Sequence, residues 1–152
     1  MIHILAALLL AAPAVAQSAA KPVKEAWDRT PATVADAWVR SNPVPGRPAA
    51  GYLTITGGGA PDKLVGVTSP GLRIELHSMS MNGGVMKMAK LDSVPVPASA
   101  KVAFASGGNH LMIHGLTGAR KTVPLTLMFG SGATVTPTAE VRARGSDPHA
   151  GH

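Results

Sequence analysis

Short runs of residues with high β-propensity recur along this chain, separated by glycine, proline, serine and asparagine. The runs follow one another at a spacing of about 8–12 residues, and none keeps the helical periodicity of about 3.6 residues. This pattern predicts an all-β protein, an antiparallel two-sheet sandwich with Greek-key connections. The predicted strands are Thr33–Arg40, Ala50–Thr56, Lys63–Thr68, Leu72–Met81, Val85–Leu91, Lys101–Ala105, His110–His114, Thr122–Phe129 and Thr134–Arg142.

The ends of the chain differ in composition from this β-rich middle. Residues 4–12 form an apolar run, and Ala14-Val15-Ala16 before Gln17 has the pattern of a signal-peptidase site, so we expect residues 1–16 to be a cleaved export signal. The run is shorter than the roughly 20 residues of a membrane-spanning helix, so we expect no membrane span after cleavage. The rest of the 152 residues would form a lead-in at 17–32, one domain at 33–145 and a flexible tail at 146–152.

The chain is basic, with a formal net charge of +6, and it contains no cysteine. Its lysines and arginines are scattered, and no basic run is longer than Arg120-Lys121, which together with export argues against nucleic-acid binding. The charge is either a generally solvated surface or a means of steering toward an acidic partner domain. Export would place the protein in the periplasm, an oxidising compartment where a chain without thiols has none to lose. We expect a monomer.

Two histidines and two methionines are grouped in one region of this chain. Ten residues separate His77 from Met88, twenty-one separate Met88 from His110, and Met112 follows two positions later. Imidazole suits several transition metals, but the soft thioether favours Cu(I), and without a thiolate the His₂Cys electron-transfer copper centre is excluded. Side chains alternate along a strand, so His110 and Met112 would share one face. The set predicts a four-coordinate Cu(I) site that holds copper without cycling it.

The segment between His77 and Met88 has the pattern of a β-hairpin. Asn82-Gly83 is a strong signal for a two-residue type I′ turn, because both positions of that turn require positive φ. With this turn, His77 would lie directly opposite Met88, with Cβ atoms about 4.5–5.5 Å apart. A three-residue loop that ends at Gly84 would shift the pairing by one residue.

The ligand pattern His-x10-Met-x21-His-x-Met resembles that of the periplasmic copper chaperones called PCu(A)C. The resemblance extends from about Thr33 to about Val141 and implies a cupredoxin-like version of the sandwich. It also implies delivery of Cu(I) to the dinuclear copper site of cytochrome c oxidase, in the copper-accepting domain of an oxidase subunit, alone or with a thiol-bearing copper chaperone. Two positions depart from the pattern, because Ser106 replaces a usual proline and His114 a common methionine. The resemblance also rests on Asp36-Ala37-Trp38-Val39-Arg40, Glu75-Leu76, Gly83-Gly84-Val85-Met86-Lys87, Leu111 and Gly115-Leu116.

Further methionine and histidine side chains are candidates for auxiliary metal ligands. Met86 shares a face with Met88 in the predicted hairpin, and His114 is a ligand, a partner of a ligand or a solvent-facing residue. In the tail, His149 and His152 form either a small separate site for Cu(II) or another divalent ion, or a flexible end without a specific ligand.

The remaining methionines and two of the aromatic residues are expected to pack in the core. A lone methionine usually fills a gap in a core, so we expect this of Met79, Met81 and Met128. We expect core packing of Trp38 and Tyr52 as well, with stacking on the metal site as the alternative for Trp38.

The leading interpretation of these patterns is a metallochaperone that carries Cu(I) in the periplasm. The alternatives are a copper sequestration or resistance protein that uses the same site without a dedicated acceptor, and a β-domain that binds no metal. We do not expect an enzyme, because the residues indicate no open metal position and no activated nucleophile. Ser78 and Ser80 have no carboxylate partner at a suitable spacing, and Glu75 could at most orient His77.

Overall fold

A computed structural model describes residues 30–143, and every regular element within them is a β-strand. Among these residues, none belongs to a helix with the length and apolar character needed to cross a membrane. The strands are β1 (Thr33–Arg40), β2 (Ala49–Thr56), β3 (Asp62–Thr68), β4 (Arg73–Asn82), β5 (Val85–Leu91), β6 (Val94–Val96), β7 (Lys101–Phe104), β8 (His110–His114), β9 (Thr122–Pro124), β10 (Thr126–Phe129), β11 (Thr134–Val135) and β12 (Thr138–Arg142).

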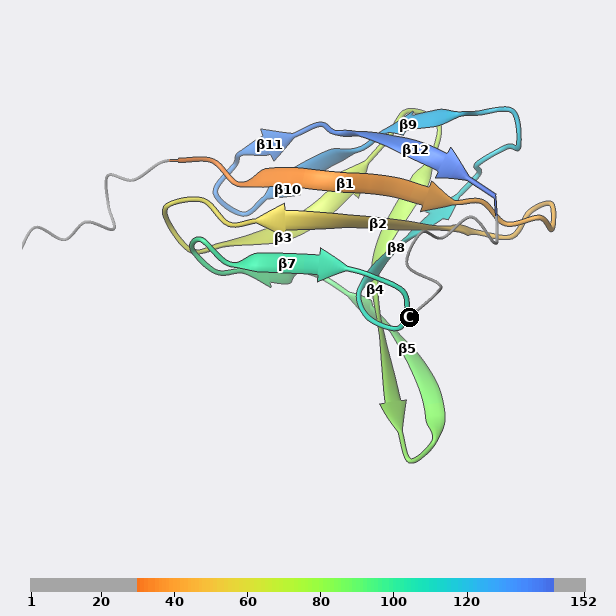
Figure 1. The fold of residues 1–152 in the computed structure, drawn as a ribbon, viewed down its shortest axis with the longest axis horizontal. Coiled ribbons are helices and arrows are strands. Elements are labelled where there is room, and N and C mark those ends of the chain that lie inside the picture. The colour runs from red at the N-terminus through yellow and green to blue at the C-terminus, as the bar shows by residue number, and fades with distance from the viewer. Residues whose placement is uncertain (1–29, 144–152) are drawn as a thin grey trace, which may run out of the picture.

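The strands form two sheets, and the β4–β5 hairpin projects well beyond the body that they build (Figure 1). The larger sheet has eight strands in the order β5-β4-β8-β2-β1-β12-β9, with β7 also paired to β2, and the smaller has the order β11-β10-β3-β6. In the described part of the chain, the pairs are antiparallel except β1 with β12. The predicted all-β, two-sheet sandwich is therefore confirmed, with one parallel pair added.

The hydrophobic core is built from alternate residues of the strands in both sheets. In β8, Leu111 and Ile113 are fully buried, whereas Met112 between them is only partly buried. Leu127 and Phe129 of β10 contribute to the core from the smaller sheet. Met112 therefore lies on the face of the larger sheet that points away from the core.

Two of the predicted strands are divided in the structure, because each run crosses from one sheet to the other. The run 122–129 becomes β9, which pairs with β12, and β10, which pairs with β3; the run 134–142 divides into β11 and β12. Pro124 and Pro137 stand at the breaks, where a residue without an N–H cannot continue a ladder. The N–H of Leu125 donates to the carbonyl of Pro137 instead. The sequence pattern did not predict the short strand β6, which pairs with β3.

Trp38 and Tyr52 are buried, as expected, but they pack against each other outside the main hydrophobic cluster. The register of β1 against β2 shifts between Ala35 and Trp38, and Asp36 within this bulge has a φ of 54°. A bulge changes which residues face which side of a sheet. Val39 consequently enters the core, while Trp38 lies on the opposite face against Tyr52, with ring centroids 4.9 Å apart.

Candidate metal centre

The predicted ligands lie on three adjacent strands at one edge of the larger sheet. β4 is in the middle and pairs with β5 on one side and with β8 on the other. His77 of β4 lies directly opposite His110 of β8. Their rings are stacked, with centroids 5.9 Å apart and planes inclined by 30°. Two of the predicted ligands are therefore neighbours, as a shared metal ion requires.

The side chain of His110 is fixed by the loop that precedes β8. His110 is only 7% exposed, and its Nδ1 lies 3.2 Å from the carbonyl oxygen of Gly108. Since a carbonyl can only accept a hydrogen bond, Nδ1 carries the proton and Nε2 keeps its lone pair. The same carbonyl accepts a hydrogen bond from the backbone N–H of Met79 at 3.1 Å. Gly108 thus ties β4 to the imidazole of His110.

His77 presents its other ring nitrogen to the site. Its Nε2 lies 3.1 Å from Oε2 of Glu75 and donates to that carboxylate. Nδ1 of His77 is buried and has no hydrogen-bond partner among the described residues. A buried polar atom without a partner is unfavourable by about 1–3 kcal/mol, and a metal ion on the lone pair would remove that penalty. Each histidine thus offers one unprotonated nitrogen, the form that ligates metals.

The β4–β5 hairpin is present as predicted, but its turn lies one residue further along the chain. Gly83 and Gly84 have φ values of 60° and 80°, and Asn82 pairs with Val85 across the turn. Both central positions of a type I′ turn need positive φ, which glycine adopts without a steric penalty. Gly-Gly therefore replaces the predicted Asn-Gly at the turn.

This displacement of the turn changes the cross-strand partners of the two predicted ligands on the hairpin, His77 and Met88. Met88 lies opposite Met79, and His77 lies opposite Lys90, so the predicted pairing of His77 with Met88 is wrong. Moving a two-residue turn by one residue shifts each partner by two positions, and a shift of two keeps every side chain on its original face. Met88 therefore still lies on the face of His77, one rung nearer the turn.

A pocket of about 220 Å³ opens where the hairpin meets β8. Met79 and Met88 line it from the hairpin, and His110 and Met112 line it from β8. Three of the four predicted ligands thus meet in one pocket, and the fourth, His77, stacks on His110. The wall is completed by Arg40, Pro48, Ala49, Ala50, Tyr52, Ser106 and Gly107.

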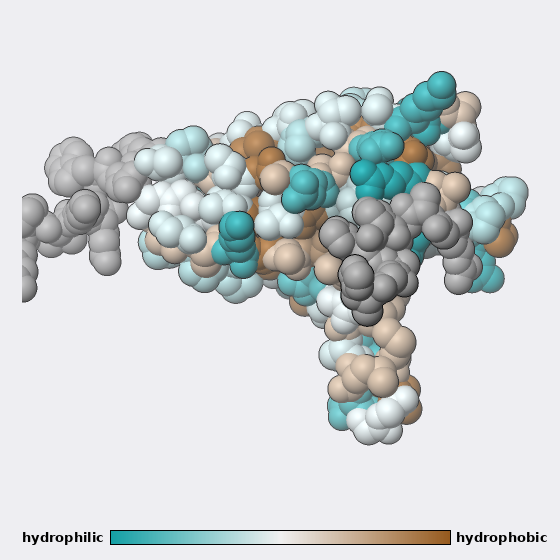
Figure 2. All heavy atoms as spheres, in the orientation of Figure 1, coloured by the Kyte–Doolittle hydropathy of each residue, from teal (hydrophilic) through white to brown (hydrophobic). Residues whose placement is uncertain are grey.

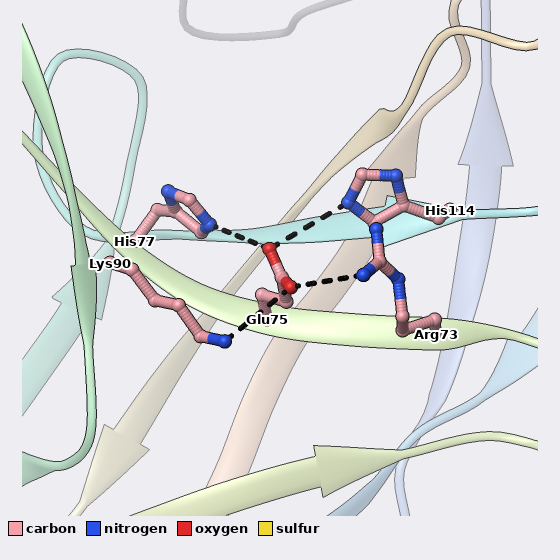
Figure 3. Close-up of polar contacts among 5 residues, drawn as sticks. All are labelled: Arg73, Glu75, His77, Lys90 and His114. Atoms are coloured by element: carbon pink, nitrogen blue, oxygen red, sulfur yellow. Dashed lines mark hydrogen bonds and ion pairs between the residues drawn. The ribbon is translucent and has the colours of Figure 1, made fainter.

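Glu75 is the centre of a charge network beside His77 (Figure 3). Its Oε1 lies 3.5 Å from Nη1 of Arg73 and 3.5 Å from Nζ of Lys90. The hydrogen bond from His77 lowers the pKa of Glu75 below its ordinary value of 4.5; partial burial opposes this shift, and the charges of Lys90 and Arg73 add to it. The carboxylate is therefore ionised at neutral pH. A partner of this kind orients an imidazole and raises its basicity as a ligand.

Residues 32–141 match the model of a known protein family. The family is described as LpqE-like, and its description calls it a lipoprotein family. The chain belongs to the LpqE-like family. No curated protein sequence gives a significant match.

Solved structures share the fold of this LpqE-like chain. The copper-bound PCuAC domain of PmoF2 is 23% identical, with a TM-score of 0.60 over 74% of this chain and 92% of that domain. The apo PCuAC domain of PmoF1 is 24% identical, with a TM-score of 0.57 over 74% of this chain and 93% of that domain. CuI-DR1885 from Deinococcus radiodurans is 27% identical, with a TM-score of 0.56 over 77% and 81% of the two chains. These matches confirm the resemblance to PCu(A)C proteins and the fold that it implies.

Met79 is the pocket residue that the sequence patterns of this LpqE-like chain did not predict. The expected place in the core is wrong for Met79, Met81 and Met128, because none of the three belongs to the hydrophobic cluster. Met79 is half-buried and lines the pocket, while Met81 is 68% exposed. The alternation of side chains along a strand could have indicated Met79 as a pocket residue, because Met79 follows His77 by two positions and shares its face.

His114 lies in the charge network of Glu75 and does not line the pocket. Its Nε2 is 3.8 Å from Oε2 of Glu75, and the residue lies opposite Arg73 in the β4–β8 register. This nitrogen is buried and has no hydrogen-bond partner among the described residues. His114 therefore lies beside Glu75, the partner of His77, and not at the pocket.

The other candidate auxiliary ligands lie away from the pocket or outside the described residues. Met86 pairs with Met81 on the hairpin and is 55% exposed. His149 and His152 lie outside residues 30–143, as does the expected export signal.

Proposed function

We propose that this protein binds one Cu(I) ion through His77, Met88, His110 and Met112 and acts as a copper metallochaperone. The observation that carries the proposal is the meeting of Met88, His110 and Met112 at one pocket, with His77 stacked on His110. The free nitrogens of the two imidazoles and the two thioether sulfurs form a soft ligand set. Such a set favours Cu(I) over hard cations and over Zn(II), whose protein sites use Cys, His and carboxylate.

Proteins with the same fold support copper as the cargo. One matching structure is described as a copper-bound PCuAC domain and another as the Cu(I) form of DR1885. The four residues that we propose as ligands lie within residues 32–141, the part of this chain that matches the family.

The exposure of the site favours a carrier of copper over a store. Met88 is 47% exposed and lies on the projecting hairpin, and Met112 is only partly buried. Transfer requires that a ligand of the acceptor reaches the metal before the donor ligands leave, so exposed thioethers favour exchange. A sequestration protein, the alternative function, gains from shielding the same metal ion from such attack.

The destination that we propose is the dinuclear copper site of cytochrome c oxidase, with a thiol-bearing copper chaperone as a second partner. The resemblance of the ligand pattern to PCu(A)C proteins supports this destination. The signal pattern at residues 1–16 and the lipoprotein description of the family support a location outside the cytoplasm, which we propose to be the periplasm. A site filled by four protein ligands leaves no open position for a substrate, so we propose no enzymatic activity.

A transfer experiment separates the two functions. The protein is titrated with Cu(I) under anaerobic conditions against a chromophoric chelator, and the loaded protein is then mixed with the apo copper domain of the oxidase subunit. We expect one tightly bound Cu(I) and its appearance in the acceptor. Binding without transfer would support sequestration, and failure to bind Cu(I) would contradict both functions.

The tail histidines would add a second kind of site. A Cu(II) site at His149 and His152 stays a prediction, since both residues lie outside the described part of the chain. Deletion of residues 146–152 should alter Cu(II) uptake and leave the Cu(I) affinity unchanged. Loss of Cu(I) binding on this deletion would show that the primary site is wrongly assigned.

A further inference from the structure

Four methionines form two directly opposed pairs on one face of the β4–β5 hairpin. Met79 pairs with Met88, and on the next rung of that face toward the turn Met81 pairs with Met86. Directly opposed residues have Cβ atoms about 4.5–5.5 Å apart. Residues two apart on one strand are about 7 Å apart, from a rise of roughly 3.4 Å per residue. Thioethers of this length can meet over such distances without any change of the backbone.

The outer pair of methionines is exposed to solvent on a projecting element. Met81 is 68% exposed and Met86 is 55% exposed. Figure 2 shows that the hairpin extends from the body of the molecule as a separate arm. The neighbouring rung on the other face of the hairpin pairs Ser80 with Lys87, so the methionines are segregated on one side. A group of exposed apolar side chains on one face is a candidate for an interaction site.

The composition of this face favours a metal over an apolar protein partner. Four of the seven methionines in the chain lie here, whereas leucine, valine or phenylalanine would serve equally well for apolar docking. The property that distinguishes methionine is its soft, polarisable sulfur. Neutral thioethers bind monovalent soft ions, and they do not satisfy Zn(II) or hard cations.

We propose that Met79, Met81 and Met86 form a second soft-metal site, which takes Cu(I) or Ag(I). Met88 connects it to the pocket, because Met88 lies opposite Met79 and lines the pocket with Met112. The second site uses no histidine, so it is independent of the two imidazoles of the proposed chaperone site. Its exposed pair, Met81 and Met86, lies nearer the hairpin turn than Met79 and Met88, which line the pocket.

Silver titration followed by NMR tests this proposal. Protein with ¹³C-labelled methionine methyl groups is titrated with Ag(I), a soft monovalent ion that needs no reductant. The first equivalent should shift the methyl signals of Met88 and Met112, and the second should shift those of Met81 and Met86. Met79 lines the pocket and also belongs to the second site, so its signal should respond to both equivalents. The double variant Met81→Leu/Met86→Leu keeps the apolar volume and should lose the second equivalent while retaining the first.

Two further variants separate the second site from the primary site. Met128→Leu is the matched control, because it removes a thioether from the other sheet, and it should bind as the wild type does. His77→Ala/His110→Ala should lose the primary site and still shift the signals of Met81 and Met86 with one equivalent of Ag(I). If those two signals stay unshifted through two equivalents in the wild type, or if the double leucine variant keeps the second equivalent, the second site is disproved.

Discussion

Oε2 of Glu75 lies 3.1 Å from Nε2 of His77, two residues further along the same face of β4. This contact leaves Nδ1 as the nitrogen that His77 offers to a metal, whereas His110 is held through Nδ1 by Gly108 and offers Nε2. As metal ligands, the two imidazoles would therefore use different nitrogens, each selected by a partner outside the proposed ligand set. Removal of such a partner should weaken copper binding without touching a ligand.

Substitution of Glu75 tests this dependence on a partner. Glu75→Gln should raise the Kd for Cu(I) by roughly 10-fold or more, the lower end of the effect of such partners in metal sites. The reason is that a neutral amide orients His77 but does not raise its basicity. A chelator competition assay measures the change. Glu140→Gln is the control, because it removes a carboxylate that pairs with Arg142 elsewhere in the same sheet. Equal affinities for the two variants would contradict the role of Glu75.

Substitution of Gly84 tests whether the turn positions the methionine ligands. Gly84 has a φ of 80°, and a left-handed conformation is unfavourable for alanine by about 1–2 kcal/mol. Gly84→Ala should therefore loosen the hairpin and lower the Cu(I) affinity by up to about tenfold, the equivalent of ~1.4 kcal/mol. The free energy of unfolding of the sandwich should change little, because the hairpin projects from the body. Gly118→Ala is the control, since a Cβ there meets nothing within 4 Å. An unchanged affinity in Gly84→Ala would show that the turn does not hold the site.

Two neighbouring residues of β8 should differ in their effect on stability. Leu111 is fully buried in the core, and Met112 is partly buried on the other face. Leu111→Ala should lower the free energy of unfolding by about 2–5 kcal/mol, the usual range for this change in a core. Met112→Ala should lower it much less and should weaken Cu(I) binding instead. Urea denaturation of the copper-free proteins measures both. Similar losses of stability would place Met112 in the core.

The stability of the fold should depend on pH through Asp62. Burial by itself would raise the pKa of Asp62. Hydrogen bonds from Ser131 Oγ and from the N–H groups of Lys63 and Ser131, together with the nearby charge of Lys63, outweigh this effect. They hold the pKa of Asp62 below its ordinary value of 3.8. A carboxyl group whose pKa is lower in the folded protein stabilises the fold at pH values above its pKa in the unfolded chain. This stabilisation is lost as the pH falls through the pKa of the folded protein.

The hydroxyl of Ser131 provides the test of this pH dependence. Ser131→Ala should reduce the loss of unfolding free energy between pH 7 and pH 3, because it removes one of the hydrogen bonds that lower the pKa of Asp62. Asp92→Asn is the control, since it changes an exposed carboxylate elsewhere on the surface. The account of Asp62 fails if Ser131→Ala keeps the full pH dependence of the wild type.

The sequence was sufficient to locate most strands and to select the ligand candidates. The β-rich runs and the residues that end them predicted the bounds of β1, β5 and β8 to the residue. Glycine and proline lie near these bounds, and they end a strand. The spacing of His77, Met88, His110 and Met112 was informative because few metals accept thioethers, so the residue types alone restrict the chemistry.

Features that depend on long-range pairing could not be predicted in this way. Both Asn82-Gly83 and Gly83-Gly84 satisfy the φ requirements of a type I′ turn. The two pairings differ by two positions and keep every side chain on the same face, so the alternation of the sequence does not distinguish them. The bulge at Asp36, which turns Trp38 to the outer face, has no sequence signal as clear as a glycine. Met79 is an apolar residue of a type that usually packs in a core. It becomes part of a pocket only because β8 and the loop before it lie beside it.

The central claim is that thioether sulfur, and not imidazole alone, binds the metal. The most direct measurement is the affinity of Met88→Ala and Met112→Ala for Cu(I) and for Zn(II), by anaerobic chelator competition, with Met128→Ala as the control. Both ligand variants should lose Cu(I) affinity by about tenfold or more, at least ~1.4 kcal/mol, while any Zn(II) binding stays as in the wild type. Full Cu(I) affinity in both variants would contradict the site and remove the chemical basis for the proposed chaperone.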